Sequence, residues 1–366
     1  MHITRIELSE IALPLVEPFI ISGGTITERR SLILVLHDEE GNRGYGECPP
    51  FELPFYSEET LAGARYLLER VLIPRIHGRT FDSVEDVDAA LRGGVRGNPF
   101  ARAALETAAW DLEAARMRVS LADRLGEKLG VTTAPEVPCG VALGIPQDRQ
   151  ITTLLQWVSS AVDTGYRRIK IKIAPGWDLE PVREVTQILA GTGLPLTVDA
   201  NGAYEWPAHE RVLLSIDDFG LLYIEQPLAP DELLGHAKLD RELHTPVCVD
   251  ETLRDARAAR QIMELAGPKV WNIKVHRVGG LTEVCRIYRI AEEYGATLWA
   301  GTMPESGIGS QAALAAASLP LFTYPSDLEP SERWFGRGND TIELTMNRKG
   351  FMQVPRTSIA ELVSDP

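Results

Sequence analysis

Two stretches near the start of the chain, residues 3–13 and 31–37, alternate apolar and polar positions. A period of two is typical of a strand with one buried face, so the pattern predicts an antiparallel pair of strands. The residues between them, PFIISGGTITERR, are expected to form a mobile loop.

Helical spacing follows in residues 57–76 and 98–117. The first of these segments begins with Ser57, a suitable N-cap, and has acidic residues in its first turn. The second is rich in strong helix formers. Strands followed by helices are typical of an α+β unit, and we assign residues 1–127 to an N-terminal α+β domain.

From residue 138 onward, short apolar runs recur with helical stretches between them. Measured between the residues that end successive runs, the steps are 27 from Lys172 to Asp199, 26 to Glu225, 25 to Asp250, 24 to Lys274 and 27 to Gly301. Stacked βα units produce so regular a period, and seven or eight of them close into a barrel. We therefore predict an α/β barrel over residues 135–321 and a tail at 322–366 that folds back onto the first domain. An open doubly wound sheet fits less well, because no strand carries a GxGxxG turn into its helix.

The composition limits which kinds of molecule the protein can bind. The 366 residues are 44% hydrophobic and 24% charged, and the longest apolar runs fall far short of a membrane span. A net charge of −15 without a basic stripe argues against a nucleic-acid partner. The start of the chain has no secretion pattern, so we expect a cytoplasmic protein. The four cysteines lack metal-ligand spacing and are expected to be core thiols.

The ends of five consecutive predicted strands carry Lys172, Asp199, Glu225, Asp250 and Lys274. In a βα barrel these ends converge on one mouth. Three carboxylates there would repel one another unless a cation lay among them, and oxygen-only ligands suit Mg²⁺, with Mn²⁺ as an alternative. A small-molecule substrate could bind through its carboxylate, and the metal would neutralise the charge that builds when the neighbouring carbon loses its proton and an enediolate forms.

The two strand-end lysines are the candidate bases. Lys170 and Lys172 lie two apart on one strand, so they point to the same face roughly 7 Å apart, and this proximity is expected to lower the pKa of one of them. Lys274, across the ring of strands, could protonate the other face of the intermediate or stabilise it as a cation. Two bases permit inversion of a stereocentre, whereas one base and an electrostatic partner permit elimination. Asn201 is a supporting candidate near Asp199, and Arg277 could modulate Lys274 or form a salt bridge at a helix entry.

At KxK, VDAN, IEQP, VDE and NIK the sequence resembles the muconate-lactonizing-enzyme subgroup of the enolase superfamily over nearly the whole chain. Closer still, IKIAPGWDLEPV, YIEQPL, VCVDET, NIKVHRVGG and SDLEPSERWFG resemble the branch that contains o-succinylbenzoate synthase and N-succinylamino acid racemase. The resemblance implies a modified TIM barrel, (β/α)7β, with an α+β capping domain built from the N-terminal region and the C-terminal tail. It also implies a place in menaquinone biosynthesis for the dehydration reaction.

The same resemblance implies residue roles: Lys172 as the first acid/base, Lys274 as the second, and Asp199, Glu225 and Asp250 as Mg²⁺ ligands. Loops around residues 20–25 and 50–56 are expected to close over the substrate, and Arg277 matches a residue of members able to racemise. The implied substrate contacts are Phe19, Ser22, Tyr56, Met303, Glu305 and Ser306, although the last two could simply cap a helix. The chain departs from its relatives in GTMPES at 301–306, where Thr302 and Pro304 alter the loop, and at Glu329, where relatives often have a small residue.

Three interpretations are open at this stage. The leading one is syn-dehydration to o-succinylbenzoate, racemisation of N-succinyl or N-acyl amino acids, or both. A dipeptide epimerase would need acidic groups to meet a free amino terminus, and Asp327 with Glu329 could supply them. A barrel that binds a metal and a carboxylate without catalysis needs the ligands but neither lysine. The sequence also leaves a homo-oligomer open.

Overall fold

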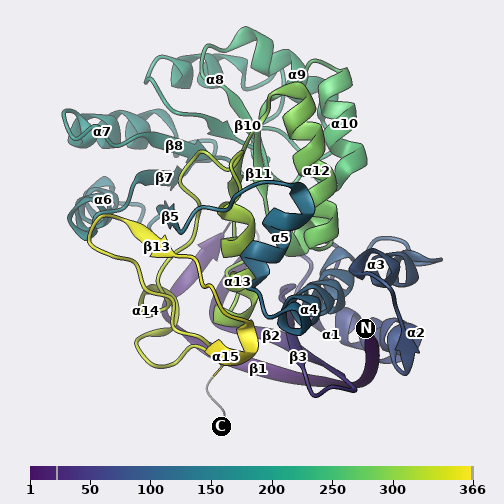
Figure 1. Ribbon diagram of the computed structural model, residues 1–366. Coiled ribbons are helices and arrows are strands. Elements are labelled where there is room, and N and C mark those ends of the chain that lie inside the picture. Colours follow the sequence, from purple (N-terminus) through teal and green to yellow (C-terminus); the bar gives the residue numbers. More distant parts are fainter. Residues whose placement is uncertain (22–23, 364–366) are drawn as a thin grey trace.

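The computed structural model describes residues 1–21 and 24–363, except the side chains of residues 19–25. Figure 1 shows an N-terminal region, drawn in purple and blue, next to a barrel drawn in teal and green, with the C-terminal segment in yellow returning beside the N-terminal sheet. Within the described ranges, no helix is both long and apolar enough to cross a membrane.

The N-terminal region is built on an antiparallel sheet with the strand order β3-β2-β1-β4. Its strands are β1 (His2–Ile21), β2 (Gly24–Asp38), β3 (Arg43–Cys48) and β4 (Arg79–Thr80). The strand pair was predicted, but β1 and β2 pair from Ile3 opposite Asp38 to Ile21 opposite Gly24. Most of the expected mobile loop is therefore part of a long hairpin, and residues 22–23 lie outside the described part.

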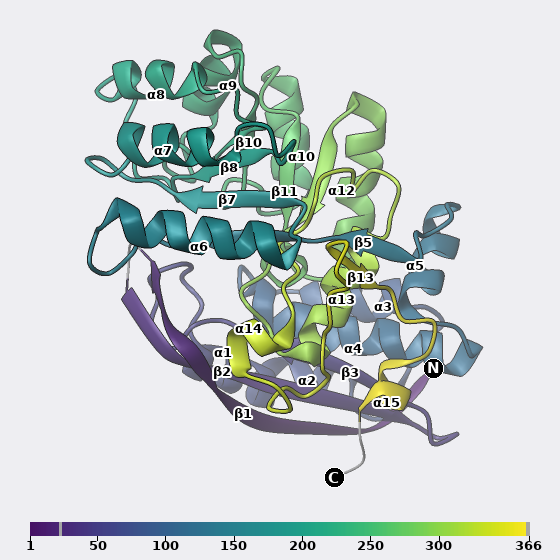
Figure 2. The ribbon, with the colours of Figure 1, turned by 90° about the vertical axis from the view of Figure 1, so that its left-hand side faces the viewer.

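Helices pack on one face of this sheet, which forms the lower layer of the molecule in Figure 2. The helices of this region are α1 (Leu61–Leu67), α2 (Ile73–Ile76), α3 (Val84–Arg92), α4 (Pro99–Met117) and α5 (Leu121–Leu129), with a π-helical turn at Leu68–Leu72. Of these, α1, α2 and α4 contact the sheet, whereas α3 and α5 pack on α4. Helix α4 lies against β3 so closely that a Cβ on Gly44 or Gly46 would meet the backbone oxygen of Ala108 or Ala104 at 2.2 or 2.0 Å. The predicted N-cap Ser57 is wrong, because Thr60 is extended and its side chain accepts the Gly63 N–H.

The second region is a sheet of seven parallel strands in sequence order. The strands are β6 (Gly140–Leu143), β7 (Arg168–Lys172), β8 (Leu196–Asp199), β9 (Ile224–Glu225), β10 (Val247–Val249), β11 (Val270–Ile273) and β12 (Thr297–Ala300). The helices are α6 (Ile151–Thr164), α7 (Leu179–Leu189), α8 (Glu210–Asp217), α9 (Leu233–Glu242), α10 (Ala256–Glu264), α11 (Val275–Val278), α12 (Leu281–Tyr294) and α13 (Gly307–Ala317). The predicted α/β barrel with a separate α+β domain is confirmed.

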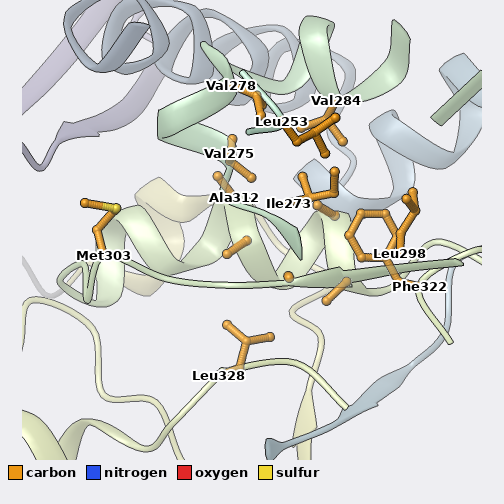
Figure 3. Close-up of a cluster of buried hydrophobic side chains, with 14 of the residues drawn as sticks. Leu253, Ile273, Val275, Val278, Val284, Leu298, Met303, Ala312, Phe322 and Leu328 are labelled. Atoms are coloured by element: carbon orange, nitrogen blue, oxygen red, sulfur yellow. The ribbon is translucent and has the colours of Figure 1, made fainter. Parts of the chain in front are cut away.

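Residues 322–327 join the two edges of this sheet. Phe322 bridges to Leu298 of β12, and Ser326 bridges to Cys139, next to β6. Figure 3 shows Leu298 and Phe322 together in the buried apolar cluster that also contains Ile273 and Leu328. The barrel thus extends beyond residue 321, where the sequence placed its end, because this segment supplies backbone hydrogen bonds to both sheet edges.

The rest of the tail contains α14 (Ser331–Phe335), β13 (Phe351–Gln353) and α15 (Ile359–Leu362). Strand β13 pairs with β5 (Glu136–Pro138), and the Ile359 N–H donates to Asp111 of α4 at 3.3 Å. The strand-like run TIELTMN contributes only an isolated bridge at Met346. The tail therefore contacts both the barrel and the N-terminal domain.

Buried carboxylates of the N-terminal domain hold it against the barrel. Glu47 of β3 accepts the N–H groups of Ser306 and Gly309 at 3.1 and 2.9 Å, where α13 begins. Glu106 of α4 accepts those of Leu281 and Thr282 at 2.8 and 2.7 Å, where α12 begins. Because helix N-termini have free N–H groups and a partial positive charge, each contact fixes a barrel helix to the other domain.

Candidate active site

The five predicted strand-end residues all lie at the carboxyl ends of parallel strands. Lys172, Asp199 and Glu225 end β7, β8 and β9, whereas Asp250 and Lys274 directly follow β10 and β11. In a barrel of this type, loops at this end form the site.

A cavity of about 270 Å³ opens between this end of the barrel and the N-terminal domain. Lys172, Asp199 and Lys274 line it from the barrel, and Phe55 and Tyr56 line it from the other domain. Glu225 and Asp250 are fully buried. The cavity therefore brings the two candidate bases to a single space that an aromatic wall partly covers.

Asp199 is paired with the lysines of β7. The Lys172 ammonium donates to Asp199 and to the Asn201 side chain, each at 2.5 Å, and Lys170 Nζ lies 3.6 Å from the same carboxylate. Burial raises the pKa of Asp199, but Lys172 and Lys170 outweigh burial and lower the pKa overall. Asp199 is therefore held as a carboxylate.

Glu225 is paired with Lys170 and an amide. Lys170 donates to one oxygen at 3.0 Å, and Asn272 donates to the other at 2.7 Å. Burial and the neighbouring Asp199 raise the pKa of Glu225. Burial lowers the pKa of Lys170, but Asp327, Glu225 and Asp199 raise it overall. The sequence predicted a lowered pKa for one lysine of the pair, and that lysine is not Lys170, because carboxylates dominate its surroundings.

Asp250 is shared between two cations. Lys274 donates to its Oδ2 at 2.9 Å, and Arg277 of α11 forms an ion pair with its Oδ1. Arg277 also donates to the Asn272 carbonyl at 2.7 Å. Burial lowers the pKa of Lys274, but Tyr56 and Glu251 outweigh burial and raise it overall. Arg277 is thus tied to Lys274 through one carboxylate.

The donor set fits a hard divalent cation. Asp199, Glu225 and Asp250 offer only oxygen ligands, which Mg²⁺ prefers. All three carboxylates are turned toward lysine or arginine, and no group of three or more His, Cys, Asp or Glu is arranged to hold a metal among residues 1–21 and 24–363. A bound cation would compete with these ammonium groups for the same oxygens.

The remaining predicted contacts divide into three groups. Tyr56, Met303 and Asn201 line the cavity. Glu305 instead accepts the Met303 N–H at 3.0 Å and pairs with His276, and Ser306 is the N-cap residue of α13. Glu305 therefore holds the loop that carries Met303, a residue that Figure 3 shows at the edge of the buried apolar cluster, whereas the Ser306 hydroxyl donates to Glu47 at 2.6 Å. Phe19 has a side chain outside the described part, and Ser22 lies outside it altogether.

Asp327 and Glu329 line the cavity but already have cationic partners. Asp327 pairs with Arg168 and with Lys170, the latter at 2.5 Å. Glu329 pairs with Arg333 and accepts the Ala142 N–H at 3.2 Å. Burial raises the pKa of Glu329 to about 7, which Arg333 only partly opposes.

Sequence reasoning missed two polar residues of this site. Glu251 lines the cavity and accepts from the Asn201 amide at 3.0 Å, and Asn272 holds Glu225. Asn272 lies two residues before Lys274, so the period of two along a strand places both on one face and could have revealed it. Glu251 follows Asp250 in a turn, where that period gives no guide.

The fold and the site define the class of proteins with an enolase-like barrel under a separate N-terminal domain. Residues 153–358 match the family described as enolase C-terminal domain-like, and residues 4–126 match the mandelate racemase/muconate lactonizing enzyme N-terminal domain. The chain therefore belongs to the mandelate racemase/muconate lactonizing enzyme family of the enolase superfamily.

The similarity to curated relatives extends over nearly the whole length of this chain and of those proteins. The chain is 44% identical to an N-succinylamino acid racemase of Thermus thermophilus, over 97% of this chain and 93% of the relative. It is 38% identical to an o-succinylbenzoate synthase of Enterococcus faecalis, over 97% and 94%. A crystal structure of an enolase superfamily member from Listeria innocua superposes with a TM-score of 0.92 at 33% identity, covering 100% of this chain and 95% of that one. A dipeptide epimerase structure from Enterococcus faecalis is more distant, at 25% identity and a TM-score of 0.88 over 98% of both chains.

Proposed function

We propose that this protein is a Mg²⁺-dependent enzyme that removes the proton next to a carboxylate and forms an enediolate. Its reaction would be syn-dehydration to o-succinylbenzoate, racemisation of N-succinyl or other N-acyl amino acids, or both. The observation that carries the proposal is that Lys172 and Lys274 line one cavity from strands on either side of Asp199, Glu225 and Asp250. The named relatives support both reactions.

Each residue of the proposed site would have a distinct role in the reaction. Asp199, Glu225 and Asp250 would hold the metal, which when bound would neutralise charge that develops on the substrate carboxylate. Lys172 would take the α-proton, while Lys274 would either deliver a proton to the opposite face or act as a fixed positive charge. The aromatic wall of the cavity would exclude water from the reacting carbon.

Exchange of the α-proton in D₂O with Mg²⁺ tests the proposal. Wild-type protein should exchange the α-proton of N-succinyl amino acids, and Lys172→Ala should reduce both exchange and dehydration by at least about 100-fold, the contribution of a positioned base. EDTA should abolish both activities, and added Mg²⁺ should restore them.

Lys269→Ala removes an exposed lysine just before β11 and is the matched control, which should keep wild-type rates. Full activity of Lys172→Ala, or activity that survives EDTA, would overturn the assignment. If the wild-type protein binds the carboxylates but exchanges none of them, the barrel is a binding module without catalysis.

A dipeptide epimerase is the second candidate, because Asp327 and Glu329 line the cavity. Their carboxylates are already paired with Arg168, Lys170 and Arg333, so a substrate ammonium would have to compete with these cations. We therefore expect N-succinyl amino acids to be turned over in preference to dipeptides. A side-by-side comparison of kcat/KM for the dehydration precursor, N-succinyl amino acids and dipeptides decides the order.

We also propose that the enzyme acts in the cytoplasm on a small molecule, without a nucleic-acid or membrane partner, and that the dehydration reaction would serve menaquinone biosynthesis. The net charge of −15 supports the absence of a nucleic-acid partner. Mn²⁺ in place of Mg²⁺ and a homo-oligomer are further proposals, which metal replacement and sedimentation would test.

A further inference from the structure

The segment between β3 and α1, residues 49–60, forms part of the cavity wall, and we name it the cap loop. Phe51, Phe55 and Tyr56 of the cap loop line the cavity. The rings of Phe51 and Phe55 stack with centroids 4.8 Å apart, and Tyr56 meets Phe51 edge-on at 6.2 Å. Such contacts make the three rings one packed unit.

Both ends of the cap loop are anchored. Arg29, which is buried, donates to the Pro50 carbonyl at 3.3 Å and to the Pro304 carbonyl at 2.8 Å, and its guanidinium lies 4.6 Å from the Phe51 ring. At the other end, Glu59 accepts the first N–H groups of α4. Tyr56 therefore lies in a loop whose position is fixed relative to both domains.

Tyr56 contacts one of the two candidate bases. The Lys274 ammonium donates to the Tyr56 hydroxyl at 3.0 Å and lies 4.6 Å from the centre of the Tyr56 ring. Lys172 is held by Asp199 and Asn201 instead. Asp250 accepts from the Lys274 ammonium at 2.9 Å, and the Tyr56 hydroxyl together with the ring face further restricts where this flexible side chain can lie.

We propose that Tyr56 is a positioning residue for Lys274, through which the N-terminal domain controls proton transfer at one face of the substrate only. This inference rests on the proposed function. Proton transfer is sensitive to the position of the base, so a loosely held Lys274 would be slow in exchange while Lys172 would keep its rate. Racemisation needs both faces, and it would depend on Tyr56 for that reason.

The experiment compares two enantiomers with the full-length, Mg²⁺-loaded enzyme. N-succinyl-L-phenylalanine and N-succinyl-D-phenylalanine each present the α-proton to a different lysine, so their exchange rates in D₂O report the two faces separately. Tyr56→Phe removes the hydroxyl and keeps the ring. We expect kcat for exchange to fall about tenfold or more for one enantiomer, as for a lost hydrogen bond to a charged group, and to change less than twofold for the other.

Phe55→Leu is the matched control, because Phe55 belongs to the same wall and its ring packs on Phe51. It should alter KM for both enantiomers alike. Equal changes of the two exchange rates in Tyr56→Phe, or no change in either, would overturn the positioning role. Absence of exchange in the wild-type enzyme would overturn the proposed function and this inference with it, so the two failures are distinguishable.

Discussion

Arg277 illustrates how a single side chain can bear on the choice between two reactions. It shares the Asp250 carboxylate with Lys274 and is itself almost fully buried. If the Arg277 guanidinium is removed, Asp250 keeps only one cationic partner, Lys274. The position of Lys274 therefore depends on Arg277. Proton delivery by Lys274 should need that position more strictly than a purely electrostatic role does.

Arg277→Gln should therefore lower kcat/KM for racemisation by roughly 10- to 100-fold, the value of a charged hydrogen bond, and dehydration by much less. Steady-state kinetics of both reactions with the same preparation measure the ratio. Arg337→Gln, at a side chain that is 82% exposed, is the control and should change neither rate. Equal losses in the two reactions would remove the proposed role of Arg277.

At this scale the strand-end residues could be predicted from sequence, because their regular spacing places Lys172, Asp199 and Glu225 at the same end of parallel strands. The partners of these residues could not. Lys170 donates to Asp327, which is 157 residues away in the chain. Asp327 belongs to the segment that joins the two edges of the barrel sheet. No local pattern indicates that contact, so the raised pKa of Lys170 could not be foreseen from the sequence.

At the scale of single elements, α9 is joined to the loop after β9 by a histidine. The His236 ring is buried: its Nδ1 contacts the Glu232 carbonyl at 2.8 Å, and its Nε2 accepts the Leu228 N–H at 3.4 Å. The neutral ring satisfies both contacts, whereas a protonated ring would lose the acceptor. Burial lowers the pKa of His236 to about 4 from the usual 6.5.

A folded-state pKa below the unfolded value means that the unfolded chain binds the proton more readily, so this contribution is complete above pH 6.5 and is lost as the pH falls toward 4. The loss amounts to about 3 kcal/mol at most. His236→Gln should therefore show a smaller drop in thermal midpoint between pH 7 and pH 5 than the wild type. His244→Gln, at an exposed ring, should keep the wild-type drop; a drop that persists in His236→Gln as well would show that other groups cause it.

The elements themselves could be predicted with uneven success. The period of the barrel was correct because each βα unit repeats the same local pattern. The end of the barrel was misplaced because residues 322–327 contribute bridges rather than a regular strand. The length of the first hairpin was underestimated, since Pro14 and its neighbours break the alternation while the strand continues through a register shift.

At the scale of the whole molecule, the two domains are joined by buried glutamates that accept backbone N–H groups far away in the sequence. Glu47 and Glu106 bind barrel helices whose N–H groups lie 259 and 175 residues away. Their burial could not be foreseen, because a glutamate on a strand or helix is usually solvated. These contacts fix the N-terminal domain over the barrel mouth, which lets the cap loop act on the site.

A ring of four ion pairs adds to this junction, and it provides a test of the docking itself. Asp88 of α3 and Glu283 of α12 are buried, and each accepts from both Arg92 and Arg286 at 2.7–2.8 Å.

Arg92→Met leaves both buried carboxylates with one cation, which should lower stability by roughly 1–2 kcal/mol after allowance for the partly exposed arginine. The thermal midpoint should fall by a few degrees, and amide hydrogen exchange should rise in α3 and α12 before other helices. Arg260→Met, at an arginine that pairs with Glu293 within the barrel alone, should leave both measurements unchanged; equal effects of the two substitutions would mean that the ring does not hold the domains together.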